Sequence, residues 1–177
     1  ANNPKPGPLH PHDYEVIAGL MVDALGGLRI GLDGLAPLPR AGDPFGQALY
    51  ALLSQTMPLE YVELVKTDFP DGTRKLTGLA GEVILAPGSL VLPVDDLITK
   101  AGTKVEGIDV LAEAGYIVKH VIVLVDREQG GREELEKLGI KLISVFTLTE
   151  LLDFYVASGR ISKGLCIRVL TYIRANS

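Results

Sequence analysis

Hydrophobic and polar positions along the chain follow helical and strand-like patterns in turn. Apolar residues recur at helical spacing in residues 13–25 and again after residue 102. Residues 117–126 are β-branched and nearly all apolar, as in a strand buried on both faces. Because strands alternate with helices throughout, we predict an α/β fold, a doubly wound and mainly parallel sheet flanked by helices.

The same patterns place the remaining elements. Further helices are predicted at residues 45–56, 132–139, 147–159 and 162–177, and further strands at 28–35, 59–66, 140–146 and before Asp95. A capping box of Thr147 and Glu150 opens the helix at 147–159, and Cys166 is expected to be buried in the last helix. Residues 67–82 have no period and are predicted to be a long functional or mobile loop. The four prolines of residues 1–12 indicate a flexible arm, and we expect residues 13–177 to form a single domain.

Composition narrows the classes of function. Hydrophobic residues make up 47% of the 177, enough for a buried core, and the net charge of −5 argues against a nucleic-acid partner. The single cysteine excludes an internal disulfide and disfavours a zinc site, so we expect a reducing cytoplasm. The chain has no apolar run of about 18 residues, so no membrane span is expected.

The stretch "VLPVDDLITKAGTK", residues 91–104, carries the candidate chemistry. An apolar strand is followed by Asp95 and Asp96, and residues 99–103 then form a loop before a helix. Ligands of parallel α/β sheets bind at the carboxyl ends of strands, and a helix N-terminus favours anions. The pattern is therefore consistent with a site that binds a sugar phosphate. A strand that ends in an acidic turn would give the same sequence pattern. Neither G-x-x-x-x-G-K-[ST] nor G-x-G-x-x-G is present.

Two segments resemble a known family. "VLPVDDLITKAGT" resembles the phosphoribosyl-pyrophosphate (PRPP) motif of type I phosphoribosyltransferases. "HVIVLVDREQGGREELEKLGIKLISVFTLTELLDFY" is similar to the matching part of orotate phosphoribosyltransferases. The resemblance implies transfer of 5-phosphoribosyl from PRPP to a pyrimidine base, and among such bases it favours orotate. The products would be orotidine 5′-monophosphate and pyrophosphate, in pyrimidine nucleotide biosynthesis. It also implies Mg²⁺ as cofactor and a cytoplasmic homodimer.

The resemblance also implies roles for individual residues. Asp95 and Asp96 would hold the ribose hydroxyls and, indirectly, Mg²⁺, with Lys66 as a further catalytic candidate. The 5′-phosphate would be bound by Thr99, Lys100, Ala101, Gly102 and Thr103. Pyrophosphate would be bound by Arg40, Arg74 and Lys75, and the base by Arg127 and Thr99. The alternative for Arg127 is a structural role, tied to Asp126 or to a neighbouring carbonyl.

The sequence departs from the family's pattern in three places. Lys100 and Ala101 stand where the family prefers a small hydroxyl residue and glycine, and Ala101 is costly if its φ is positive. Phe69 and Pro70 stand where the family tends to have a catalytic lysine followed by aspartate. Residues 1–12 match nothing in the family's N-terminal orotate-binding segment. The alternative function is therefore a catalytically impaired or inactive protein that binds PRPP or a nucleotide in a regulatory role.

Overall fold

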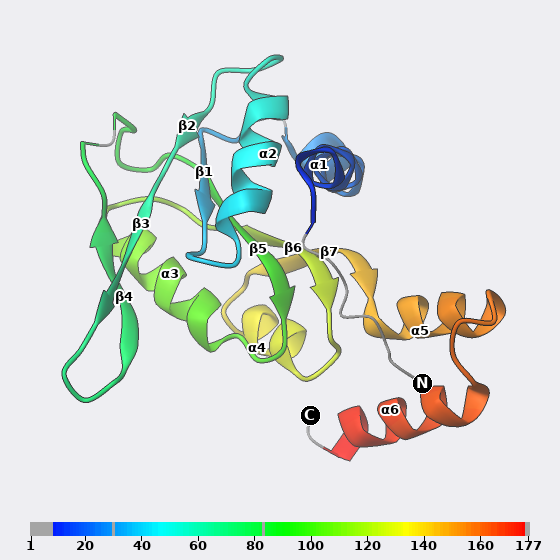
Figure 1. Cartoon of the computed structure of the whole chain (residues 1–177). Helices are drawn as coiled ribbons and strands as arrows, with labels where there is room; N and C mark the ends of the chain where they lie inside the picture. The colour runs from blue at the N-terminus through cyan, green and yellow to red at the C-terminus, as the bar shows by residue number, and fades with distance from the viewer. Residues whose placement is uncertain (1–8, 30, 83, 176–177) are drawn as a thin grey trace.

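A computed structural model describes residues 9–29, 31–82 and 84–175, so most of the predicted flexible arm lies outside the described residues. Five strands form one sheet in the order β2-β1-β5-β6-β7, and every neighbouring pair is parallel (Figure 1). The strands are β1 (Gly34–Pro37), β2 (Glu60–Tyr61), β5 (Val91–Ile98), β6 (His120–Asp126) and β7 (Lys141–Thr147). This confirms the predicted parallel α/β sheet.

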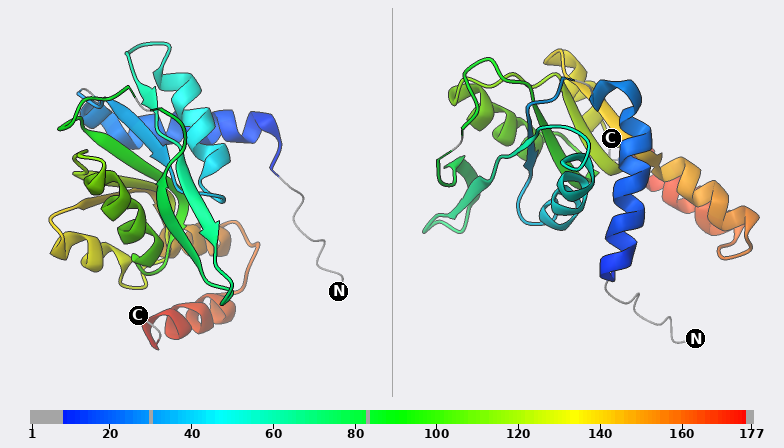
Figure 2. Two further views of the ribbon diagram at one scale, coloured as in Figure 1. Left: turned by 90° about the vertical axis from the view of Figure 1, so that its left-hand side faces the viewer. Right: turned by 90° about the horizontal axis from the view of Figure 1, so that it is seen from above.

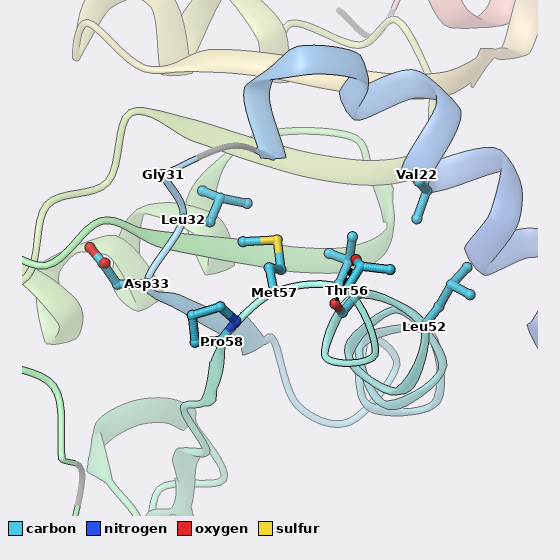
Figure 3. A pocket seen from close by; sticks show the side chains of 9 residues that line it. Val22, Gly31, Leu32, Asp33, Leu52, Thr56, Met57 and Pro58 are labelled. Carbon is cyan, nitrogen blue, oxygen red and sulfur yellow. Dashed lines mark hydrogen bonds between the residues drawn. The ribbon is translucent and has the colours of Figure 1, made fainter.

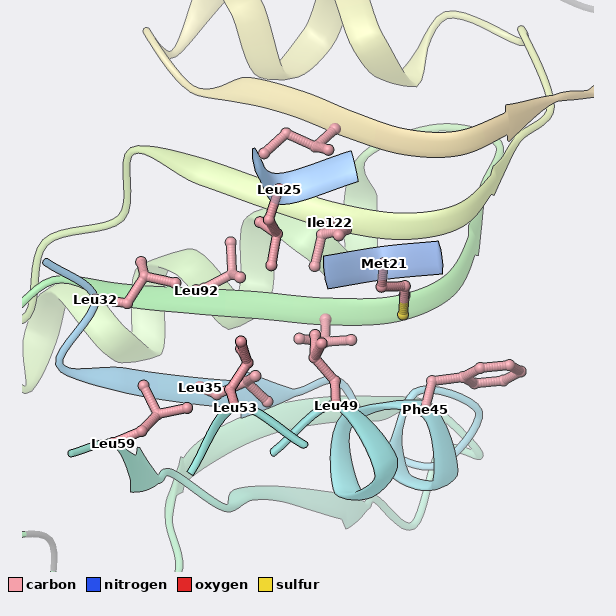
Figure 4. Packing of buried hydrophobic residues seen from close by; sticks show 12 residues of the cluster. Met21, Leu25, Leu32, Leu35, Phe45, Leu49, Leu53, Leu59, Leu92 and Ile122 are labelled. Atoms are coloured by element: carbon pink, nitrogen blue, oxygen red, sulfur yellow. The ribbon is translucent and has the colours of Figure 1, made fainter. Parts of the chain in front are cut away.

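Helices cover both faces of the sheet (Figure 2). Helices α1 (Pro11–Leu25) and α2 (Asp43–Leu53) lie on one face, and α3 (Gly102–Glu113) and α4 (Gly131–Lys137) on the other. Under α1 and α2, one buried cluster includes Met21, Leu25, Leu49, Leu92 and Ile122 (Figure 4). Under α3 and α4, a second cluster includes Ile98, Ile108, Val121, Leu135 and Leu142.

The chain ends in two helices beside the edge strand β7. Helix α5 (Leu148–Ala157) begins with the predicted capping box, in which Thr147 N donates to Glu150 Oε2 at 2.7 Å and Glu150 N donates to Thr147 Oγ1 at 3.2 Å. Helix α6 (Lys163–Ala175) follows, and its Cys166 is buried, as the apolar pattern predicts. Within the described residues, no helix is long and apolar enough to cross a membrane.

The first strand was predicted in the wrong place. Residues Gly26–Arg29 form a 3₁₀ helix, and β1 begins only at Gly34. Gly26 and Gly31 both have positive φ, at 51° and 89°. This backbone conformation is not extended, although the apolar residues of the segment had indicated a strand. The first helix also begins earlier than predicted, at Pro11, where Asp13 Oδ2 accepts a hydrogen bond from His10 N at 2.7 Å.

The loop predicted at residues 67–82 is in fact largely a β-hairpin. The predicted strand before it divides into β2 and β3 (Leu64–Asp68), and β3 pairs antiparallel with β4 (Arg74–Leu79). The hairpin escaped the sequence pattern because its exposed cross-strand pairs are polar: Thr67 and Thr77 are hydrogen-bonded at 2.7 Å. Leu64 and Leu76 bury its other face in a cluster with Leu111 of α3.

Candidate functional site

The acid pair lies within β5 rather than after it, because the strand continues to Ile98. Leu92 and Val94 belong to the cluster under α1 and α2. Side chains alternate between the two faces of a strand, so Asp95 lies on the α3 face and Asp96 is turned away from it. The prediction that the strand ends at Asp95 was therefore wrong. The two side chains leave opposite faces of the strand, although their carboxyl groups still interact.

Asp95 forms a buried ion pair with Lys104 of α3. The two side chains are each 8% exposed, and Lys104 Nζ lies 2.6 Å from Asp95 Oδ2. The same ammonium donates to Leu97 O at 2.7 Å, and Asp95 Oδ1 accepts a hydrogen bond from Asp96 N at 2.9 Å. Burial raises the pKa of Asp95 to about 6, and the Lys104 ammonium opposes that rise.

The sequence analysis did not identify Lys104 as a functional or structural residue, although the spacing of apolar residues around it indicates that it is buried. It stands four residues before Ile108 and seven before Leu111, and both of these are buried. This i, i+4, i+7 spacing puts Lys104 on the core face of α3. A lysine on a core face is rarely buried unless it is paired, so the pattern predicts a buried acid nearby.

Asp96 is the outward acid of the pair. Its side chain is partly exposed, and its Oδ1 accepts a hydrogen bond from Leu97 N at 2.7 Å. Its carboxyl group also interacts with that of Asp95, and this interaction contributes to the raised pKa of Asp95. The described part of the chain has no group of three or more metal-ligating side chains. A metal ion at this carboxylate would therefore keep water or substrate oxygens as its other ligands, which suits Mg²⁺.

The loop of residues 99–103 joins β5 to the N-terminus of α3. Ala101 has a φ of −81°, so the conformational cost that a positive φ would impose does not arise. Ala101 is fully buried, and its N–H donates to Glu134 Oε2 of α4 at 2.6 Å instead of facing solvent. Four predicted phosphate-binding residues remain at least partly exposed: Thr99, Lys100, Gly102 and Thr103.

Helix α4 supports this loop from behind. Gly131 N donates to Thr99 O at 3.0 Å. A Cβ on Gly131 would lie 2.6 Å from Ile98 Cγ1 and 2.8 Å from Thr99 O. The close approach of α4 to the loop therefore requires glycine at this position.

Substitution of Gly131 by alanine is expected to lower the free energy of unfolding by about 1–3 kcal/mol, because the new methyl group overpacks the contact with the loop. Urea denaturation measures this loss. The control is Gly19→Ala in α1, whose Cβ would have nothing within 4 Å. That change should stabilise the helix by about 0.5–1 kcal/mol. A loss at Gly19 as large as that at Gly131 would contradict the steric explanation.

The segment 38–42, which contains the predicted pyrophosphate-binding residue Arg40, lies beside the acid pair. Leu38 N donates to Val94 O at 2.8 Å, one residue before Asp95. A Cβ on Gly42 would lie 2.6 Å from both Leu38 O and Val94 O. Gly42 thus allows the segment to turn tightly against the end of β5.

Lys66 of β3 reaches this segment. Its Nζ donates to Pro39 O at 3.2 Å, although the two residues are 27 positions apart. Arg40 is the next residue and is exposed. The structure thus brings two of the predicted basic residues, Lys66 and Arg40, to the same side of the acid pair.

Two other basic candidates lie farther along the hairpin. Arg74 is exposed and pairs with Asp68, with 2.7 Å between its Nε and Oδ1. Lys75 is exposed on β4 opposite Thr67. Among the described residues, neither side chain forms a hydrogen bond or ion pair with the segment 38–42, and their role in binding pyrophosphate stays a prediction.

Arg127 follows the end of β6, next to the end of β5. Its N–H donates to Ile98 O at 2.9 Å, which places Arg127 beside Thr99, the other residue predicted to bind the base. The guanidinium forms no ion pair or hydrogen bond with any residue that the structure describes. It is available to a bound anion.

The alternative role for Arg127, a structural tie to Asp126 or to a neighbouring carbonyl, is wrong. Asp126 is buried and pairs with Arg132 of α4, whose NH2 nitrogen lies 2.9 Å from Oδ2. Arg132 also donates to Leu142 O at 3.0 Å and to Ser144 Oγ at 3.2 Å. It therefore ties α4 to β6 and β7, a structural role that the sequence did not identify.

An apolar hollow lies elsewhere. A cavity of about 670 Å³ is lined by Val22, Leu32, Asp33, Leu53, Met57 and Pro58, among others (Figure 3). Asp33 immediately precedes β1, and its Oδ2 accepts a hydrogen bond from Leu90 N at 2.7 Å, just before β5. The cavity is thus at the amino ends of these strands, opposite the edge that carries the acid pair.

Comparisons with known proteins bear on this site. The chain is 31% identical over 156 residues to an orotate phosphoribosyltransferase of Sulfolobus acidocaldarius, covering 88% of this chain and 74% of that protein. It is 32% identical over 139 residues to one of Aquifex aeolicus, covering 78% and 69%. The crystal structure of the Aeropyrum pernix orotate phosphoribosyltransferase superposes with a TM-score of 0.65 at 29% identity, covering 81% of this chain and 76% of that one. No protein-family model matches the chain.

Proposed function

The chain belongs to the orotate phosphoribosyltransferase family, and from that premise we propose that it transfers 5-phosphoribosyl from PRPP to orotate. The products are orotidine 5′-monophosphate and pyrophosphate. The observation that carries the proposal is the grouping of Asp96, the loop 99–103 and the segment 38–42 at the carboxyl end of β5. This is the edge where parallel α/β sheets bind their ligands.

The reaction needs a site that stabilises charge. As the bond from ribose C1 to pyrophosphate lengthens, negative charge grows on the leaving group and positive charge on the sugar. Lys66 and Arg40 would stabilise the departing pyrophosphate, and the Asp96 carboxylate would accept hydrogen bonds from the ribose hydroxyls. Mg²⁺, when bound, would neutralise part of the pyrophosphate charge, and the partly exposed Asp96 carboxylate suits a hydrated ion of this kind.

Two further groups of the protein would bind the 5′-phosphate of PRPP and the carboxylate of orotate. The exposed part of the loop 99–103 and the N-terminus of α3 would hold the 5′-phosphate with backbone N–H groups and hydroxyls. The unpaired guanidinium of Arg127, next to Thr99, would bind the carboxylate of orotate, because such pairs form charge-assisted hydrogen bonds. The homodimer that the family resemblance implies stays a prediction.

A second candidate is a family member that binds PRPP without efficient transfer. Two observations favour it: the Ala101 N–H is bonded to Glu134, and the Arg74 guanidinium is paired with Asp68. Each removes a donor that the resemblance assigns to substrate phosphates. The two candidates share the binding site and differ in turnover.

Release of pyrophosphate distinguishes the two candidates. We expect the protein to release pyrophosphate when PRPP, orotate and Mg²⁺ are all present, and much less when orotate or Mg²⁺ is omitted. Calorimetric binding of PRPP is measured alongside. Binding of PRPP without pyrophosphate release would support the second candidate, and failure to bind PRPP in Mg²⁺ would reject both.

A further inference from the structure

We propose that the two acids of the pair have separate tasks: Asp96 alone binds the ribose of PRPP or its hydrated Mg²⁺, whereas Asp95 and Lys104 form a structural pair that holds the end of β5 against α3. This inference rests on the proposed function. It changes the assignment made by family resemblance, in which both acids hold the ribose hydroxyls.

Both carboxylate oxygens of Asp95 already have a partner within the fold. Its Oδ2 is 2.6 Å from Lys104 Nζ, and its Oδ1 accepts the Asp96 N–H at 2.9 Å. Both side chains of the ion pair are 8% exposed. A ribose hydroxyl that bound Asp95 would have to displace Lys104 and leave a buried ammonium without its counter-ion, which is costly.

Lys104 joins the end of β5 to α3. It pairs with Asp95 and also donates to Leu97 O at 2.7 Å, so one ammonium binds the residues on both sides of Asp96. Asp96 Oδ1 is in turn held by Leu97 N at 2.7 Å. Lys104 thus has a structural role, since both of its contacts lie within the fold and neither involves the Asp96 carboxylate.

The pair also sets the charge that PRPP meets. With Asp95 neutralised by Lys104, the acid pair presents about one negative charge to the site instead of two. PRPP is itself highly anionic, and a second unpaired carboxylate near it would weaken its binding by repulsion. One outward carboxylate retains a ligand for the ribose diol or hydrated Mg²⁺ at lower repulsive cost.

Calorimetric titration of PRPP in Mg²⁺ tests the separation of tasks. The first variant is Asp96→Asn, compared with Asp109→Asn, which removes one exposed acid of α3 outside the site. The second is the double variant Asp95→Asn with Lys104→Met, which removes both buried charges together. We expect Asp96→Asn to weaken PRPP binding about tenfold or more, and the double variant and Asp109→Asn to stay within about threefold of the wild type.

Each result of the titration either supports the inference or overturns it. If the double variant is folded by circular dichroism and loses as much affinity as Asp96→Asn, the inference is overturned. If it does not fold, the double variant Asp95→Asn with Lys104→Gln, which keeps a donor for Leu97 O, is judged by the same affinities. In the wild type, the ¹³C signal of the Asp96 side-chain carboxyl should shift on addition of PRPP and Mg²⁺ more than that of Asp95; the reverse also overturns the inference. A wild type that does not bind PRPP rejects the proposed function itself.

Discussion

Substitution of Lys66 by methionine is expected to slow phosphoribosyl transfer by about 10²- to 10³-fold, the usual cost of losing one preorganised group that stabilises transition-state charge. Lys66 Nζ donates to Pro39 O at 3.2 Å, which holds the ammonium beside the segment proposed to bind pyrophosphate. Negative charge on the pyrophosphate grows as its bond to ribose breaks. The loss should therefore appear mainly in kcat and less in the KM for PRPP.

Steady-state kinetics with both substrates varied measures the effect of Lys66. The control is Lys119→Met, which removes an exposed lysine just before β6, at the amino end of the sheet. Lys66→Arg keeps the charge and should recover part of the rate. If Lys66→Met has the same kcat as Lys119→Met, Lys66 takes no part in leaving-group stabilisation.

Substitution of Lys104 by methionine is expected to lower the free energy of unfolding by about 3–5 kcal/mol, as is typical when one partner of a buried ion pair is removed. The variant leaves the Asp95 carboxylate buried without a counter-ion and takes a donor from Leu97 O. Domains of this kind are stable by only about 5–15 kcal/mol, so the variant would be close to unfolding at moderate temperature. Urea denaturation at neutral pH measures the loss.

The double variant Asp95→Asn with Lys104→Met should recover most of this stability, because neutral groups can replace a buried ion pair at little cost. The control Lys119→Met should change stability by less than about 0.5 kcal/mol, as exposed substitutions usually do. A double variant no more stable than Lys104→Met would show that the unpaired carboxylate is not the cause of the loss.

The loss at Lys104 should also depend on pH. Burial already raises the pKa of Asp95 to about 6, and removal of the ammonium that opposes this rise raises it further. A carboxyl whose pKa is higher in the folded than in the unfolded protein costs stability as pH rises above the unfolded value of about 3.9. The loss should therefore be largest near pH 7 and shrink towards pH 4.

The sequence by itself determined the class of fold and the place of the site. The β-branched run of β6 and the capping box of Thr147 and Glu150 are local signals, and both appear as predicted. The run "VLPVDDLIT" identified the edge of the sheet that carries the acid pair, and with the later motif it identified the family. Such signals survive because they depend on neighbours along the chain and on burial, which periodicity records.

Only the tertiary structure decided which groups meet. Periodicity shows that a face is buried but not what lies against it. Only the fold therefore shows that Asp95 pairs with Lys104 and that Asp126 pairs with Arg132. The hairpin of β3 and β4 was invisible for a related reason: its exposed pairs are polar, and cross-strand neighbours are distant in sequence. Long-range pairing thus determined which acid faces outward, because a carboxylate buried with a lysine is not free to bind a ligand.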